Sequence, residues 1–302
     1  MKSFDIVVDS NCDLPQEYLT KNGIDTLPMQ FTLDGQEHNG GSWQDISPSD
    51  FYSKLGNGSL AQTSQVNPGT YFELFEKYAK EGKDLVMIIL SSGLSGSYAS
   101  AVSAAKDISE QYPDNNIFPI DSITASMGCG VLTWLAVQKR EEGLSAADTA
   151  KWLDEKKNSV FSLFTVDDLH FLHRGGRLSK VSAVAGSLLG VKPLLNVSPD
   201  GNLKLKDKAR GRKAAIETLL AQMKRCVEPG KPINVVGISH GDCLADAQKL
   251  GELIKGTYDV GEVIYTAMSP IIGAHTGPGG IALFFEGNIT RAEYEAKYYP
   301  GK

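Results

Sequence analysis

Residues 85–97 read LVMIILSSGLSGS, and this stretch decides the fold class. Residues 85–90 are apolar throughout, which is typical of a strand buried on both faces of a parallel sheet. The serines and glycines of 91–97 predict a loop, and 97–108, which is rich in alanine and serine, predicts a helix. A buried strand that runs through a short loop into a helix indicates an α/β fold.

The rest of the first half repeats this alternation of strand and helix. Pro68 suits the first turn of a helix, and Ser47 is a predicted N-cap. Strands are predicted at 4–9, 27–33 and 117–120, and helices at 48–55, 68–81 and 126–141, with a turn and a helix start at 10–15. We therefore expect a mostly parallel sheet in an N-terminal domain of residues 1–158.

The second half, residues 159–302, predicts strands of both directions. Pro199-Asp200-Gly201 lies between the strand patterns 192–197 and 203–208 and is a strong hairpin signal. Further strands are predicted at 161–166, 233–239, 263–268 and 281–285, and helices at 167–173, 182–189, 214–225 and 245–253. These patterns indicate a C-terminal mixed α/β domain.

The composition excludes several classes of protein. Of the 302 residues, 41% are hydrophobic and 22% charged, which excludes a disordered or fibrous chain. The net charge of −6 argues against nucleic acid as a partner, because binding phosphates needs a basic excess. The apolar runs are too short to cross a bilayer and no signal peptide is evident, so we expect a cytoplasmic protein without stable membrane insertion. The scattered cysteines are interpreted as buried thiols: Cys12, Cys129, Cys226 and Cys243.

Small hydroxyl residues and glycines follow three strands of the predicted parallel sheet. Ligands of open α/β sheets bind at the carboxyl ends of the strands, and a Gly/Ser loop at a helix start offers N–H groups to an anion. The residues of these loops that could serve such a site are Ser10, Ser92, Ser95, Gly96 and Ser126. Serine capping of the helices is the alternative interpretation, and the sequence leaves both open.

Common catalytic patterns do not match these loops. No loop ends in Gly-Lys-Ser/Thr, and Gly93-Leu94-Ser95-Gly96 places the second glycine of a nucleophile elbow one residue early. A hydrolase using Ser95 and His275 stays open, although nothing in the sequence ties the two together. His170 and His173 share a helix face, but no further ligands complete a metal site, so we expect no metal.

Three further segments each allow two interpretations. The segment 272–280, IGAHTGPGG, is too glycine-dense for a core helix, so we interpret it as a tight connection or as backbone that approaches a ligand. Thr63-Ser64-Gln65 is a hydroxyl-rich turn that could simply cap the helix at Pro68. The basic residues between 204 and 213, which include Arg210, fit a solvated strand edge or a docking patch for an acidic partner.

At these loops the chain resembles the DegV family of bacterial fatty-acid-binding proteins. The resemblance runs from end to end, although 64–67 and 170–173 depart from the family pattern. Its motifs are Val8-Asp9-Ser10, Asp13-Leu14-Pro15, Thr63-Ser64-Gln65, Pro68-Gly69, Ser92-Gly93-Leu94-Ser95-Gly96-Ser97, Asp121-Ser122, Ser126-Met127-Gly128, Gly175-Gly176-Arg177-Leu178-Ser179, Lys192-Pro193 and residues 272–279. It implies a DegV-like fold of two domains, 1–158 with a Rossmann-like sheet and 159–302 with a mixed sheet, and a long-chain fatty acid buried between them.

The resemblance also implies a carboxylate site. The hydroxyls of Thr63 and Ser95, the helix start at Gly96 and the side chain of His275 would hold the carboxylate, and His275 could add charge if protonated. Residues in supporting roles would be Ser10, Ser92, Ser126, Arg174, Arg177 and Arg210.

By the same resemblance the protein is a monomeric lipid carrier rather than an enzyme. It would present the carboxylate to an ATP-dependent fatty acid kinase, which makes acyl phosphate for phospholipid synthesis, and it would need no cofactor besides the bound lipid. Arg174 and Arg177 would dock the kinase or steady the phosphate. The alternative is a Ser/His hydrolase or a phosphotransferase that acts on an acyl substrate.

Overall fold

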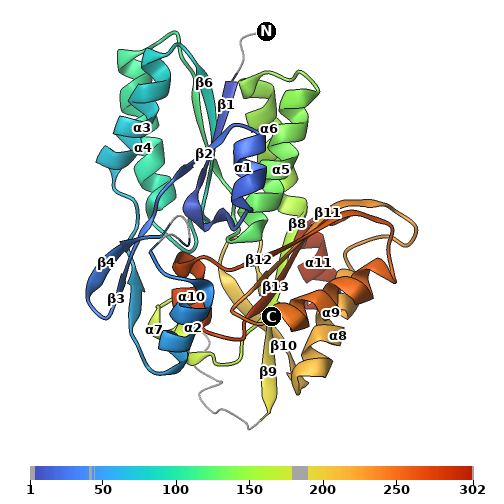
Figure 1. Ribbon diagram of the computed structural model, residues 1–302. Helices are drawn as coiled ribbons and strands as arrows, with labels where there is room; N and C mark the ends of the chain where they lie inside the picture. The colour runs from blue at the N-terminus through green and yellow to red at the C-terminus, as the bar shows by residue number, and fades with distance from the viewer. Residues whose placement is uncertain (1–3, 41–42, 44, 179–189, 301–302) are drawn as a thin grey trace.

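The computed structural model describes residues 4–40, 43, 45–178 and 190–300 (Figure 1). Its strands are β1 (Phe4–Asp9), β2 (Ile24–Leu27), β3 (Gln30–Leu33), β4 (Gln36–Asn39), β5 (Ala61–Thr63), β6 (Asp84–Ile89), β7 (Ile117–Asp121), β8 (Val160–Thr165), β9 (Val191–Val197), β10 (Leu203–Arg210), β11 (Ile233–His240), β12 (Val260–Ala267) and β13 (Ile281–Glu286). Its helices are α1 (Gln16–Lys21), α2 (Pro48–Gly56), α3 (Pro68–Lys80), α4 (Ser97–Gln111), α5 (Met127–Glu141), α6 (Ala146–Lys156), α7 (His170–Arg174), α8 (Arg212–Met223), α9 (Leu244–Lys255), α10 (Pro270–Thr276) and α11 (Arg291–Tyr298).

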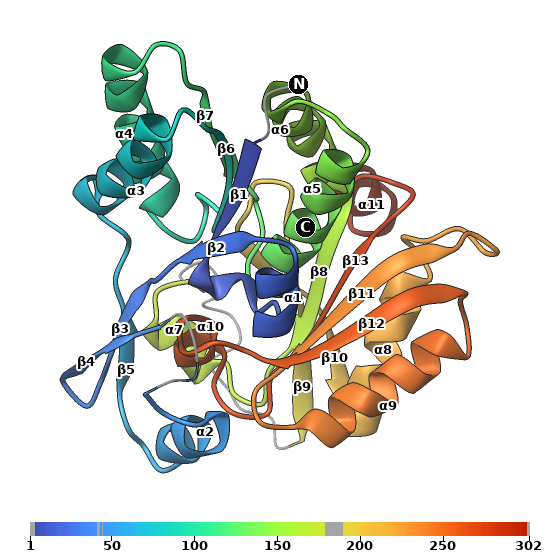
Figure 2. The same ribbon diagram turned by 45° about the horizontal axis from the view of Figure 1, so that its top comes forward.

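The first sheet is parallel throughout, as predicted. Its strand order is β2-β1-β6-β7, so β6 is an inner strand. Helices α3 and α4 cover one face and α5 and α6 the other (Figure 2). Because both faces are covered, the apolar side chains of β6 from Leu85 to Ile89 are fully buried.

The second sheet is mixed, which confirms the prediction for the second half. Its order is β10-β9-β8-β13-β11-β12, and every neighbouring pair is antiparallel except β11 and β12. The predicted hairpin joins β9 to β10, with Gly201 at φ +76° in its turn. The predicted boundary at residue 158 falls in a 3-10 turn (Lys157–Ser159) between α6 and β8.

Helix α5 packs between the two sheets. Every residue from Met127 to Thr133 is buried, because this helix contacts β1 and β6 on one side and β8, β11 and β13 on the other. Glycine makes the close approach possible on both sides. A Cβ at Gly130 would lie 2.8 Å from the Cys12 carbonyl oxygen, and one at Gly237 of β11 would lie 2.9 Å from Met127.

The prediction of one strand over residues 27–33 is wrong. The chain forms β2 up to Leu27 and then β3 from Gln30, which belongs to a separate antiparallel sheet of order β4-β3-β5. Pro28 has no N–H to continue a strand ladder. The N–H of Met29 instead donates to Ser10 Oγ at 2.9 Å. The interruption therefore sends the chain from one sheet to another.

The prediction that the segment 272–280 cannot form a core helix is also wrong. Its first half lies in α10, where Gly273 and Ala274 are buried. Pro270 sits at the helix start, and Gly273 allows close packing, because a Cβ there would lie 2.6 Å from Tyr52 Oη. Only residues 277–280 form a tight connection, with Gly277 and Gly279 at positive φ.

Other predictions concern the membrane, the cysteines and one more helix. In the described ranges no helix has the length and apolar character needed to cross a bilayer. Cys12, Cys129 and Cys226 are buried free thiols as predicted, whereas Cys243 is partly exposed. The predicted helix 182–189 lies outside the described residues.

Candidate functional site

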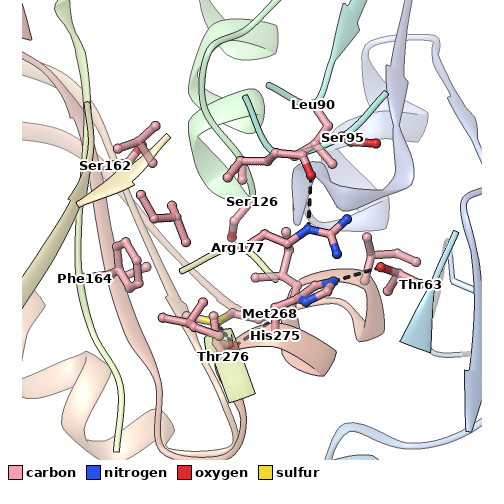
Figure 3. Close-up of a pocket in the computed structure, with 18 of the residues that line it drawn as sticks. Thr63, Leu90, Ser95, Ser126, Ser162, Phe164, Arg177, Met268, His275 and Thr276 are labelled. Atoms are coloured by element: carbon pink, nitrogen blue, oxygen red, sulfur yellow. Dashed lines mark hydrogen bonds between the residues drawn. The ribbon is translucent and has the colours of Figure 1, made fainter. Parts of the chain in front are cut away.

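A largely apolar pocket lies beyond the carboxyl ends of β6 and β7, where the two large sheets meet (Figure 3). Its empty volume is about 790 Å³, including the part open to solvent. Leu90 and Leu94 follow β6, Phe164 and Phe284 come from β8 and β13, and Ile271 and Ile272 from α10. A concave apolar cavity of this size is typical of a small-molecule site.

Polar side chains gather at one end of this pocket. Thr63 ends β5, Ser95 lies in the loop before α4, and His275 is on α10. Thr63 Oγ1 lies 2.8 Å from His275 Nε2 (Figure 3). The Val66 N–H donates to Ser97 Oγ at 3.1 Å, which fixes the segment after β5 against the Ser95 loop. Two chain segments that are far apart in sequence therefore present hydroxyls to the same space.

The hydrogen bonds of His275 orient the Thr63 hydroxyl. His275 Nδ1 is buried without a hydrogen-bond partner among the described residues. A buried N–H without an acceptor is rarer than a buried acceptor without a donor, so we assign the proton to Nε2. Nε2–H then donates to Thr63 Oγ1, and the Thr63 proton is left to donate into the pocket.

The hydrogen bonds of Ser95 also allow its hydroxyl to donate into the pocket. Its Oγ accepts from the Ser97 N–H at 3.2 Å and lies 2.9 Å from Ser97 Oγ. When the Ser97 hydroxyl donates to Ser95, the Ser95 proton is free to donate to a ligand. This end of the pocket therefore offers two hydroxyl donors, which suits an acceptor such as a carboxylate.

The positive charge here belongs to arginine and not to histidine. Burial, together with the neighbouring charges of Arg177 and Arg174, lowers the pKa of His275 to about 4. With this pKa His275 is neutral at neutral pH, so the condition for it to add charge is not met there. Arg177 lines the pocket and is held by hydrogen bonds from Nε to the Leu94 carbonyl (3.1 Å) and from Nη1 to the Gly175 carbonyl (2.5 Å).

Two glycines leave room for these side chains. A Cβ at Gly175 would lie 2.1 Å from His275 Nδ1, so only glycine fits against the imidazole ring. Gly96 is the N-cap residue of α4, and a Cβ there would lie 2.1 Å from Gln65 Oε1. The N-cap of α3 is Asn67, so the interpretation of 63–65 as a cap for that helix is wrong.

The structure brings together some of the predicted site residues. Thr63, Ser95, Arg177 and His275 line the pocket, and Gly96 follows Ser95. Ser126 also lines it, but its hydroxyl donates to the buried Asp13 and lies 3.1 Å from the Ser239 hydroxyl.

Four supporting candidates do not line the pocket. Ser10 Oγ is buried and engaged with Met29 N–H and the Gly40 carbonyl, and Ser92 Oγ donates to Asp121. Arg174 is exposed over the ring of Phe171, and Arg210 is exposed at the end of β10. Of the three loops, those after β6 and β7 therefore reach the pocket through Ser95 and Ser126, whereas the Ser10 and Ser92 hydroxyls are bonded within the scaffold.

The basic residues of β10 serve different purposes. As expected of a charged edge, β10 is an outer strand, and Lys208 and Arg210 are exposed. Lys206, however, is buried and pairs with Glu295 at 2.7 Å, so it is not part of a solvated edge. Arg212 pairs with Asp246 at 2.9 Å.

Several residues that line the pocket were not predicted from the sequence. Ser162 and Phe164 share one face of β8, and Ala282 and Phe284 share one face of β13. Period-2 alternation could have separated the two faces, but β8 is buried on both faces and shows no polar alternation.

The geometry also bears on the hydrolase alternative. The partner of Ser95 is Ser97, and the partner of His275 is Thr63, so Ser95 and His275 do not form a nucleophile–base pair. Within the described part of the chain no three His, Cys, Asp or Glu side chains gather to hold a metal ion.

Fold and site together define an α/β protein with an apolar pocket between two sheets and hydroxyl donors at one end. The sequence model of the "Uncharacterised protein, DegV family" matches residues 3–288, and the chain belongs to the DegV family. A DegV domain-containing protein of Clostridium perfringens is 38% identical over 95% of this chain and 99% of its own length.

Solved structures of the family have the same fold. The chain superposes with a TM-score of 0.85 on a DegV lipid binding protein from Thermotoga maritima, at 28% identity over 96% of this chain and 100% of that one. A DegV family protein from Thermus thermophilus, described for its fatty acid binding, gives a TM-score of 0.84 at 27% identity over 95% of this chain and 100% of that one.

Proposed function

We propose that this protein binds one long-chain fatty acid, with the acyl chain in the pocket and the carboxylate at its polar end. The observation that carries the proposal is the pocket itself, which is apolar along its walls and has Thr63, Ser95 and His275 gathered at one end. The fatty acid binding described for the relative from Thermus thermophilus supports it.

The polar end suits an ionised carboxylate. An anion entering a largely apolar pocket needs hydrogen-bond donors and a nearby positive charge. The Thr63 and Ser95 hydroxyls supply the donors, and the guanidinium of Arg177, which lines the same pocket, supplies the charge. Because the clamp contains no paired nucleophile and base, it holds the carboxylate without modifying it.

The apolar walls supply the binding free energy. Each buried CH₂ contributes about 0.8 kcal/mol, so a chain of about fifteen supplies roughly 12 kcal/mol before costs. Association and ordering remove much of this amount. The hydroxyl clamp therefore sets the orientation of the ligand, and the walls set most of the affinity.

The proposal extends to a carrier role. The carrier presents the bound carboxylate to an ATP-dependent fatty acid kinase in the cytoplasm, and the acyl phosphate serves phospholipid synthesis. Ser64, Gly96 and Arg174 are exposed next to the polar end, which supports access for a partner from that side. In this proposal residues 1–158 and 159–302 act as two domains that enclose the acyl chain in a monomer.

Mass spectrometry of the purified protein tests the binding function. A native mass above the sequence mass, with one fatty acid released by denaturation and solvent extraction, is the expected result. An unshifted native mass that stays unshifted after incubation with palmitate, stearate and oleate would contradict the proposal. Ester hydrolysis by the lipid-free protein would instead favour the hydrolase.

A charge reversal at Arg174 tests the kinase role. Arg174→Glu is expected to slow acyl-phosphate formation by a bacterial fatty acid kinase by about tenfold, because an exposed rim charge mainly affects encounter. Stearate affinity should stay unchanged, since Arg174 does not line the pocket. Lys213→Glu reverses another exposed cation and is the control. Equal rates for wild type and Arg174→Glu would exclude docking through Arg174.

A further inference from the structure

The turn between β7 and α5 is held in a strained conformation. Ile123 has φ +47° and Ser126 has φ +56°. A β-branched residue in this left-handed region is an outlier, and such strain persists only where the surroundings hold it. Ala125 and Ser126 of the same turn line the pocket, so the strained segment is part of its wall.

Hydrogen bonds from within the turn and from two other segments hold it. Asp121 Oδ1 accepts from the Ile123 N–H at 3.0 Å, and the Ser91 N–H donates to the Thr124 carbonyl at 2.9 Å. The Ile123 carbonyl accepts from Arg291 Nη1 at 2.8 Å. This last bond comes from near the end of the chain, because Arg291 is the first residue of α11.

Arg291 is an unusual cation. It is only 1% exposed, and its guanidinium donates to the backbone carbonyls of four residues. Besides Ile123 it contacts the carbonyls of Ser198 at 3.2 Å and Lys157 at 3.2 Å. Burying a guanidinium without a hydrogen-bonded carboxylate is costly. We therefore look for the role of Arg291 in the segments whose carbonyls it binds.

Apart from the Lys157 carbonyl, the carbonyls that Arg291 contacts belong to two segments that contribute walls of the pocket. Ile123 precedes Ala125 and Ser126, and Ser198 follows Val197, which also lines the pocket and accepts from Nη1 at 3.4 Å. One guanidinium therefore connects the turn after the parallel sheet to the β9–β10 hairpin of the mixed sheet.

We propose that Arg291 is a positioning residue for the ligand, which keeps the strained turn 121–126 and the β9–β10 hairpin in place as walls of the acyl-chain pocket. This inference rests on the proposed function, because the ligand is taken to be a fatty acid. Arg291 acts through the turn and does not itself line the pocket.

Glycine at position 123 provides a direct test. Glycine adopts positive φ without strain, so a turn with Ile123→Gly no longer needs to be held. Arg291→Met removes the guanidinium and retains the bulk of the side chain. We expect Arg291→Met to weaken stearate binding about 10- to 100-fold, since the strain that it releases is of that order. The double variant Arg291→Met/Ile123→Gly should return to within about fivefold of wild type.

Controls separate positioning from general stability. Arg225→Met removes an exposed arginine that stacks on Tyr298 of α11, and it should bind stearate like wild type. Where Arg291→Met fails to fold, Arg291→Lys with and without Ile123→Gly gives the same comparison. An Arg291→Met variant that binds stearate like wild type would overturn the inference. So would a loss of binding that glycine at 123 does not restore, because that loss would indicate a general role in folding.

Hydrogen exchange separates this inference from the proposed function. Faster exchange in peptides covering 121–130 is expected in Arg291→Met, with reversal in the double variant. If wild type binds no stearate and this pattern is seen, the proposed function fails while Arg291 still positions the turn. Unchanged exchange in Arg291→Met would contradict the positioning role whether or not stearate binds.

Discussion

Ser95 and Ser126 follow neighbouring strands of the parallel sheet and both line the pocket, but their hydroxyls are used differently. Ser95 accepts from the Ser97 N–H and pairs with the Ser97 hydroxyl, and its own proton is free for a ligand when that hydroxyl donates. Ser126 donates to the carboxylate of Asp13, which also accepts from the Ser269 N–H at 2.8 Å.

The difference comes from the neighbours of each serine. A buried carboxylate accepts a hydrogen bond from the serine beside it, and this bond fixes the serine hydroxyl within the scaffold. Asp13 is such a carboxylate, and burial raises its pKa to about 7. Ser95 has no carboxylate among its hydrogen-bond partners, so it remains available. Position at a strand end therefore brings a serine to the pocket, and its partners decide whether it can bind a ligand.

The strongest test of this comparison is removal of Asp13. Asp13→Ala leaves the buried Ser269 N–H without an acceptor and removes one of the two hydrogen bonds of the Ser126 hydroxyl, which keeps only Ser239, and each lost bond costs about 1–3 kcal/mol. We expect the free energy of unfolding to fall by about 3 kcal/mol or more in urea denaturation. Ser95→Ala should change it by less than about 1 kcal/mol, because Ser95 is only half-buried. Similar losses for both variants would remove the distinction between scaffold and ligand serines.

The second prediction concerns binding by the two hydroxyl donors. Thr63→Val and Ser95→Ala each remove one hydrogen bond to the proposed carboxylate, so stearate affinity should fall about 10- to 100-fold in each. Isothermal titration calorimetry on lipid-free protein measures the change. Ser109→Ala is the control, because its exposed hydroxyl bonds to the Lys106 carbonyl of α4 away from the pocket. An affinity loss in Ser109→Ala equal to that in Ser95→Ala would show that the pocket end is wrongly placed.

Much of the fold could be predicted from the sequence, because it follows from local pattern. The apolar run of β6 and the hairpin turn at Gly201 are such signals, and both formed where expected. β4 and β5 were not predicted, since each has only three or four residues and β4 is mostly exposed, and their pairing with β3 is set by contacts across the chain. Helix α10 was missed because its glycine serves close packing against Tyr52.

The site was predictable in residue type but not in arrangement. The glycine- and hydroxyl-rich motifs pointed to Thr63, Ser95 and His275, which lie together at one end of the pocket. Nothing local to Ser10 or Ser92 shows that their partners are Gly40 and Asp121. The neutral state of His275 was also hidden, because it depends on burial and on Arg177.

The third prediction uses the buried carboxyl of Asp13 and the pH dependence of stability. Its pKa is about 7 in the folded protein, well above the model-peptide value of 3.8. Folding therefore binds a proton between these values, and stability falls as pH rises through that range, by up to about 1.4 kcal/mol per pH unit. Asp13→Asn should lose this contribution and show a shallower decline between about pH 5 and 7. Asp9 has the same raised pKa and keeps its own contribution in both proteins.

Urea unfolding of wild type and Asp13→Asn across this pH range measures the difference in slope. The two proteins share every other titratable group, so those contributions cancel in the comparison. Parallel curves would mean that Asp13 is not the buried acid that titrates here.

The smallest expected effect concerns the hydroxyls that are available to a ligand. His275 is hydrogen-bonded to one of them, the hydroxyl of Thr63. Because the pKa of His275 is lowered to about 4, the imidazole stays neutral above that pH. The ratio of stearate affinities of wild type and His275→Gln should therefore stay constant within about twofold between about pH 6 and 8. An imidazole with an ordinary pKa would gain charge below about pH 6.5 and strengthen carboxylate binding only in wild type. If the ratio of wild-type to His275→Gln affinity rises as the pH falls, His275 supplies positive charge to the site. If the ratio stays constant, the charge comes from Arg177.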